Sequence, residues 1–154
     1  FYVGALMGSI VALRTLDPEP AGRHWVIFLL AVVFVGDAGA FYSGRSLGRH
    51  ALAPRLSPKK TVEGLVGGIV ASIAAAVALA ELWFPELQTS AAIGLGLMLG
   101  LLGVLGDLFE SFLKRSAGVK DTSALIPGHG GILDRIDSVL FAAPALLLCL
   151  LWMA

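Results

Sequence analysis

The hydrophobic positions of this chain fall into five long apolar stretches, separated by short polar connections. The stretches cover residues 1–16, 25–42, 65–84, 91–112 and 138–154. A helix needs about 20 mostly apolar residues, within a range of about 17–25, to cross the hydrocarbon core of a bilayer. The pattern therefore predicts an all-α fold, a polytopic transmembrane helical bundle with about five membrane segments. The first stretch is short and is interrupted by Arg14, which is typical of a truncated or re-entrant span.

Composition agrees with a lipid environment. Hydrophobic residues make up 57% of the 154 residues and charged residues 14%, with a mean hydropathy of +0.87. Soluble domains average about 45–50% apolar and about 25% charged residues. The single cysteine, Cys149, excludes an internal disulfide, and we interpret it as a small buried hydrophobic residue. Among the 19 glycines, Gly96-x-x-x-Gly100 is typical of close helix packing in lipid.

The start of the chain differs from a signal peptide. Phe1 lies inside an apolar stretch, with no preceding charged region and no cleavage site. We therefore expect residues 1–154 to form a single transmembrane domain that is truncated at its N-terminus.

Lysine and arginine are concentrated in two of the connections. Nine of the 11 basic residues lie in residues 43–64 and 114–137. If the spans alternate in direction, these two connections lie on the same side of the membrane. The positive-inside rule makes that side cytoplasmic, so the two arguments agree, and the C-terminus is expected on the opposite side.

Acidic residues occur in or beside the second, fourth and fifth apolar stretches. They are Asp37, Asp107, Glu110, Asp134 and Asp137. A charged residue at the centre of a span costs about 2.5–3.5 kcal/mol on insertion scales, so the presence of each acidic residue needs a physical reason. Asp107 and Glu110 are three residues apart and share one helix face, and Ser111 and Lys114 continue that face. The pattern predicts that three spans bring carboxylates to the same cytoplasmic level.

Clustered carboxylates repel one another unless they are protonated, paired with cations or bound to a metal. Because basic residues are close along the chain, ion pairing is an alternative for Glu110, Asp121 and Asp137. For Asp107 and Asp134 we favour a metal. Oxygen ligands without His or Cys favour Mg²⁺, which usually binds one or two carboxylates together with substrate phosphates.

Two polar segments could bind phosphate. Residues 127–131 read Pro-Gly-His-Gly-Gly, and their backbone N–H groups could approach an anion closely. A helix that begins at about Leu133 would point its positive end at the same place. Residues 57–61 read Ser-Pro-Lys-Lys-Thr, which suits either phosphate ligands or a basic surface near anionic headgroups. Walker and dinucleotide-binding glycine motifs are absent, so a nucleotide would bind among helix ends and loops.

Residues 111–137 closely resemble the signature of phosphatidate cytidylyltransferases, also called CDP-diglyceride synthases. Residues 106–111 (Gly-Asp-Leu-Phe-Glu-Ser) and 57–64 (Ser-Pro-Lys-Lys-Thr-Val-Glu-Gly) also resemble motifs of this family. Residues 37–45 resemble a further motif. The family commonly has Tyr where this chain has Phe41, so this chain lacks a hydroxyl group at that position. The resemblance covers the chain from about residue 30 to its end, and family members have further spans before the second helix.

The resemblance implies a metal site and a nucleotide site. Asp107 and Asp134 match the metal-binding aspartates of the family. Further catalytic residues are expected at Lys114, Arg115 and His129. Substrate-binding residues are expected at Asp37, Ser57, Lys59, Lys60, Thr61, Lys120, Asp121, Gly130, Gly131 and Arg135. A second cation beside Mg²⁺ is left open.

The family implies a membrane nucleotidyltransferase of phospholipid biosynthesis that forms CDP-diacylglycerol and pyrophosphate from CTP and phosphatidic acid. We expect it in the bacterial inner membrane, with membrane lipid around it, an active site facing the cytoplasm and no nucleic-acid partner; a homodimer is left open. One alternative is a related CTP-dependent enzyme acting on another lipid phosphate or a polyprenol. A transporter would move substrate without CTP turnover, and a non-catalytic fragment would fold without activity.

Overall fold

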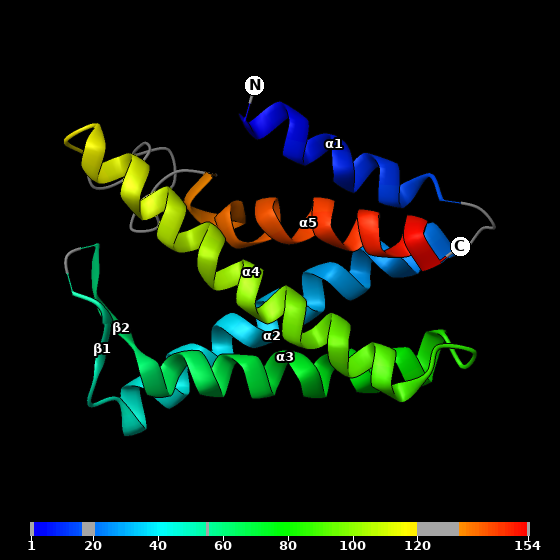
Figure 1. Ribbon diagram of the computed structural model, residues 1–154, viewed down its shortest axis with the longest axis horizontal. Coiled ribbons are helices and arrows are strands. Elements are labelled where there is room, and N and C mark those ends of the chain that lie inside the picture. The colour runs from blue at the N-terminus through cyan, green and yellow to red at the C-terminus, as the bar shows by residue number, and fades with distance from the viewer. Residues whose placement is uncertain (1, 17–20, 55, 120–132, 154) are drawn as a thin grey trace.

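The computed structural model describes residues 2–16, 21–54, 56–119 and 133–153, without the side chains of residues 2, 3, 5 and 133–135. Its described elements are α1 (Tyr2–Arg14), α2 (Ala21–Leu47), β1 (Ala51–Ala53), β2 (Ser57–Thr61), α3 (Val62–Trp83), α4 (Thr89–Ser116) and α5 (Leu133–Met153). The prediction of an all-α polytopic bundle is confirmed, with one small hairpin added (Figure 1).

Four described helices are long and apolar enough to cross a membrane: α2, α3, α4 and residues 136–153 of α5. The chain is therefore an integral membrane protein. Helix α1 has 13 residues and is about 20 Å long, which is shorter than the hydrocarbon core of about 30 Å. This length agrees with the short first segment that the sequence predicts.

The two ends of the bundle differ in what they carry. Figure 1 shows the end of α1, the start of α2, the α3–α4 connection and the end of α5 at one end of the molecule. The β1–β2 hairpin and the C-terminal turn of α4 lie at the other, which we call the hairpin end. Lys59, Lys60, Lys114 and Arg115 therefore lie at the same end, as alternating spans predict.

The hairpin is a correction to the predicted loop at residues 43–64. Helix α2 continues to Leu47, and the two strands pair antiparallel, with Ala51 opposite Thr61. Hydropathy cannot detect these strands because they are short and β2 consists of polar residues and a proline. Strand β2 leads directly into α3, whose first turn is capped by Thr61 Oγ1 accepting the Gly64 N–H at 3.1 Å. The two lysines of β2 are thus held on a regular element.

Helix α4 extends beyond its apolar stretch and ends in a defined cap. Gly118 has a φ of 70°, the left-handed conformation that glycine adopts most readily. Its N–H donates to the Arg115 carbonyl at 3.1 Å, and the Val119 N–H donates to the Lys114 carbonyl at 2.9 Å. This is a Schellman motif, and Lys114 and Arg115 in the last turn interact favourably with the helix dipole.

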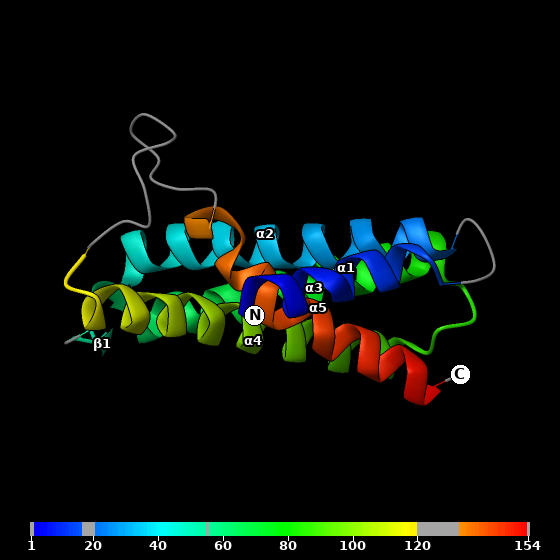
Figure 2. The same cartoon turned by 90° about the horizontal axis from the view of Figure 1, so that it is seen from above.

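Glycines let the long helices approach closely. A Cβ atom added at Gly96 would lie 2.7 Å from Ile73 Cα, so the expected close packing around Gly96 and Gly100 is confirmed against α3. A Cβ atom at Gly106 would lie 2.6 Å from the carbonyl oxygen of Asp137, where α4 meets α5. The start of α5 overlaps α2 in the view of Figure 2, and α5 contacts both α2 and α4. Residues of these three helices line one cavity near the hairpin end.

Candidate active site

A cavity of about 820 Å³ lies at the hairpin end, among α2, the hairpin, α3, α4 and α5. Its charged lining residues are Asp37, Arg45, Lys59, Lys60, Asp107, Lys114 and Asp137. Its apolar lining residues include Phe34, Phe41, Leu52, Leu65 and Val104. The volume is within the range of about 300–1,000 Å³ that is typical of small-molecule sites. The cavity therefore offers both charged and apolar side chains to a ligand.

An ion pair between Lys60 and Asp107 joins the hairpin to α4 inside this cavity. Lys60 Nζ contacts Asp107 Oδ2, and the two side chains are 24% and 34% exposed. The other carboxylate oxygen, Asp107 Oδ1, accepts a hydrogen bond from the Ser111 hydroxyl at 3.5 Å. Asp107 is therefore partly accessible from the cavity, and its position is set by residues of two elements.

Two further carboxylates approach this ion pair from other helices. Asp37 on α2 and Asp137 on α5 each interact electrostatically with Asp107 and with Lys60. Asp137 Oδ1 also accepts the backbone N–H of Ser138 at 2.7 Å. The predicted convergence of carboxylates from three spans is thus observed for Asp37, Asp107 and Asp137.

Glu110 takes part in a buried ion pair. Its side chain is 2% exposed, and Oε1 lies 3.3 Å from Lys114 Nζ, one turn further along α4. Ion pairing, the alternative that the sequence left open for Glu110, is therefore confirmed. Because Lys114 also lines the cavity, the ion pair with Glu110 positions the Lys114 ammonium group at the cavity lining.

Glu63 ties the corner between α2 and β1 to the start of α3. Its Oε2 accepts the backbone N–H groups of Arg49 at 3.0 Å and His50 at 3.2 Å. Its Oε1 lies 2.6 Å from His50 Nδ1. The Val62 N–H adds a bond to the His50 carbonyl at 2.9 Å. Sequence reasoning noted Glu63 only as part of a motif, whereas the structure shows that it anchors the hairpin carrying Lys60.

We expect Glu63→Ala to loosen the hairpin. Amide hydrogen exchange in β1 and β2 should become at least about tenfold faster, because one hydrogen bond to a charged acceptor contributes about 1.5–3 kcal/mol. Glu81→Ala, on the same helix but far from the hairpin, is the matched control and should leave these rates unchanged. Equal exchange rates in the Glu63→Ala variant and the unmodified protein would show that the corner is held by other contacts.

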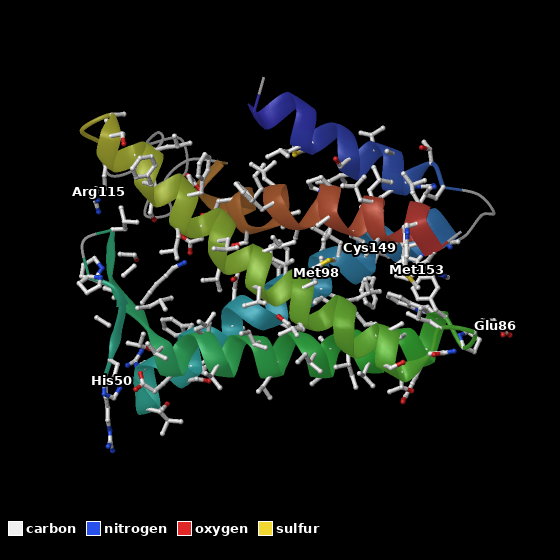
Figure 3. All side chains as sticks on the ribbon, in the orientation of Figure 1. His50, Glu86, Met98, Arg115, Cys149 and Met153 are labelled. Atoms are coloured by element: carbon white, nitrogen blue, oxygen red, sulfur yellow. The ribbon has the colours of Figure 1, made fainter. Side chains whose placement is uncertain are left out.

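The structure brings together many of the site residues that the sequence predicts. Those that line the cavity are Asp37, Lys59, Lys60, Thr61, Asp107 and Lys114. Ser57, at the first position of β2, does not line it. Arg115 is exposed at the end of α4 and points away from the bundle in Figure 3, so it too lies outside the cavity lining.

Other predicted residues lie where the structure gives no side-chain position. Lys120, Asp121, His129, Gly130 and Gly131 are outside the described residues. Asp134 and Arg135 belong to the first turn of α5, as the sequence predicts for this helix start, but only their backbone is described. The approach of Asp134 to Asp107 therefore stays a prediction, although Asp137, one turn further along α5, lies in the same cavity as Asp107.

Comparison with known proteins decides the family. Residues 1–153 match the cytidylyltransferase family. The chain belongs to the cytidylyltransferase family. It is 45% identical over 132 residues to phosphatidate cytidylyltransferase of Staphylococcus aureus (strain COL), a match that covers 84% of this chain and 50% of that protein. It is 42% identical over 148 residues to phosphatidate cytidylyltransferase of Brucella suis biovar 1 (strain 1330), covering 96% of this chain and 54% of that protein. The chain spans about half the length of the curated relatives it matches.

Sequence reasoning did not assign a site role to several residues that line the cavity of this cytidylyltransferase-family chain. Arg45 was only part of a motif, and Asp137 was only a candidate for ion pairing. A helical reading of residues 37–45 could have found Arg45, because Asp37, Phe41 and Arg45 follow one another at intervals of four and share a helix face. The position of Leu52 in the cavity lining could not be predicted from the sequence, because it depends on the pairing of the two hairpin strands.

The carboxylates of the cavity suit a hard cation. Asp37, Asp107 and Asp137 supply only oxygen ligands, which is the donor chemistry that Mg²⁺ prefers. Among the residues whose side chains are described, no group of three or more His, Cys, Asp or Glu is close enough in this arrangement to hold a metal ion. An Mg²⁺ site in this family member would therefore need Asp134, substrate oxygens or a shift of these side chains.

Proposed function

We propose that this chain builds the catalytic cavity of a phosphatidate cytidylyltransferase, which forms CDP-diacylglycerol and pyrophosphate from CTP and phosphatidic acid. The observation that carries the proposal is the cavity itself, in which lysines and carboxylates from four elements face one another inside a membrane bundle. Its family and the names of its relatives support the same reaction.

The charged and apolar lining residues of the cavity suit two different substrates. Basic side chains from α2, β2 and α4, namely Arg45, Lys59, Lys60 and Lys114, would face the phosphates of CTP. Apolar lining residues on membrane-spanning helices, Phe34 and Val104 among them, would lie next to the glycerol and the first acyl carbons of phosphatidate. Phosphatidate could then keep its chains in the bilayer while its headgroup enters the cavity.

The reaction proposed is an in-line substitution at the α-phosphorus of CTP. A phosphate oxygen of phosphatidate forms the new P–O bond, the bond to the bridging oxygen breaks, and pyrophosphate leaves with the electron pair. The residues of this chain position the two anions and offset their charge, rather than forming a covalent intermediate. Lys59 and Lys60 on the hairpin and Lys114 on α4 reach the cavity from different elements.

The cavity needs more positive charge than its side chains supply. The described lining has four basic and three acidic side chains, which leaves a charge of only about +1 for two anionic substrates. Mg²⁺ held by Asp107 and Asp134 would neutralise phosphate charge and orient the triphosphate. We further propose that the hairpin end faces the cytoplasm of a bacterial inner membrane, because its basic residues follow the positive-inside rule.

The test is to follow the labelled phosphates of CTP. With purified protein, Mg²⁺ and phosphatidate in mixed micelles, label from the α-phosphate should enter the lipid fraction, and label from the γ-phosphate should appear in pyrophosphate. Diacylglycerol and a polyprenyl phosphate serve as alternative acceptors. Transfer to one of these in preference to phosphatidate, or no transfer at all, would contradict the proposal.

A further inference from the structure

Lys60 occupies an unusual position for a residue expected to bind phosphate. Its ammonium group is paired with Asp107 and also interacts electrostatically with Asp37 and Asp137. These three carboxylates come from α4, α2 and α5, whereas Lys60 comes from β2. A single flexible side chain from the hairpin thus supplies positive charge to carboxylates of three helices.

A nearby cation stabilises such a group of carboxylates. Acidic side chains that share a cavity destabilise one another's charged forms, and a paired cation removes much of that cost. Lys114, which also lines the cavity, is 3.3 Å from Glu110. The ion pair of Asp107 is with Lys60, so the carboxylate expected to bind metal is the one that this ammonium group contacts.

We infer that Lys60 and a divalent cation compete for Asp107, so that Lys60 holds this carboxylate before the nucleotide binds and then moves to the phosphates of the metal–nucleotide complex. The inference rests on the proposed function. An ammonium group and a metal ion on the same carboxylate oxygen repel each other, so each weakens the interaction of the other with Asp107 Oδ2. Lysine is a compact charge on a flexible stem, so it can change partners without movement of β2.

Competition has a thermodynamic consequence. The metal must displace Lys60 when it binds alone, whereas CTP offers Lys60 new partners and so lowers that cost. Metal and CTP should therefore tighten each other's binding, by the same factor in both directions. Much of this coupling should disappear when residue 60 carries no charge.

The first test compares Mn²⁺ binding, measured by electron paramagnetic resonance without CTP, in Lys60→Met and in the unmodified protein. Lys60→Met should bind Mn²⁺ about tenfold more tightly, because the competing charge-assisted contact is lost. Lys59→Met is the matched control, since it removes a neighbouring charge from the same cavity but leaves the Lys60–Asp107 pair in place. Its Mn²⁺ affinity should change less than about threefold. Equal or weaker binding in Lys60→Met, or equal gains in both variants, would overturn the inference.

A second measurement needs no change at Lys60 and so remains decisive if Lys60→Met fails to fold. Amine acylation of the unmodified protein, quantified by mass spectrometry, should increase severalfold at Lys60 when Mg²⁺ is added, with Lys59 as the internal reference. Asp107→Asn should increase labelling of Lys60 without Mg²⁺. Labelling that is insensitive to Mg²⁺ would contradict the competition.

These measurements separate the inference from the proposed function, because neither needs turnover. If Lys60→Met binds Mn²⁺ more tightly but the unmodified protein transfers no cytidylyl group, the competition stands and the proposed reaction is wrong. If the unmodified protein is active but Lys60→Met binds Mn²⁺ with unchanged affinity, the proposed reaction stands and the competition is wrong.

Discussion

Asp107→Asn should lower CTP-dependent formation of CDP-diacylglycerol by about 100-fold or more. The substitution keeps the size of the side chain but removes the charge that pairs with Lys60 and that would bind Mg²⁺. Loss of a metal ligand or of a charge-stabilising group in an active site usually costs about this factor. The measurement is the initial rate of transfer from CTP to phosphatidate at saturating Mg²⁺.

The control for Asp107→Asn is Glu86→Gln. Glu86 lies in the α3–α4 connection at the opposite end of the molecule (Figure 3), so its substitution should leave the rate unchanged. Thermal unfolding in detergent checks that both variants remain folded. If the Asp107→Asn variant retained activity within about tenfold of the unmodified protein, the proposed role of Asp107 would be wrong.

Gly106→Val should lower both activity and stability, because Gly106 determines how closely α5 approaches α4. An added Cβ atom would lie 2.6 Å from the Asp137 carbonyl oxygen and 3.3 Å from Phe141 Cβ, so α5 must shift. That shift would move Asp137 within the cavity, together with the helix turn that contains Asp134. We expect transfer to fall by about 100-fold, and overpacking of this kind usually costs about 1–3 kcal/mol of unfolding free energy.

The same helix provides the control for Gly106→Val. A Cβ atom at Gly94 would meet no other atom within 4 Å, so Gly94→Val tests the effect of a branched residue in α4 without a clash. Both variants are compared by transfer rate and by thermal unfolding. Equal behaviour of the two variants would show that the α4–α5 contact does not position the site.

The helices of this fold could be predicted from the sequence because lipid exposure leaves a strong signal in hydropathy. That signal marks only the part of each helix that lipid surrounds. Hydropathy therefore predicts that α2 begins at about Trp25, whereas it begins at Ala21. It also predicts that α4 ends at about Phe112, whereas α4 ends at Ser116. The added turns carry polar residues, Lys114 among them, which are important for the cavity.

The hairpin could not be predicted because its stability depends on contacts between distant residues. Strand β2 has few apolar residues, and the Glu63 carboxylate that holds the corner at His50 is 13 positions away along the chain. Charge spacing predicted that carboxylates of three helices meet, and this is observed for Asp37, Asp107 and Asp137, because a helix places residues at fixed intervals on a face. It could not predict that Lys60 pairs with Asp107, since that partner comes from another element, whereas Glu110 and Lys114 are one turn apart on the same helix.

The most direct test of the account is the position of Mn²⁺ in an experimental structure of the protein with CTP, located by its anomalous scattering. We expect one Mn²⁺ in the cavity, in contact with the carboxylates of Asp107 and Asp134 and with CTP phosphates, and we expect Lys60 to have moved from Asp107 to a phosphate. Density for Mn²⁺ elsewhere, or either carboxylate turned towards lipid, would contradict it.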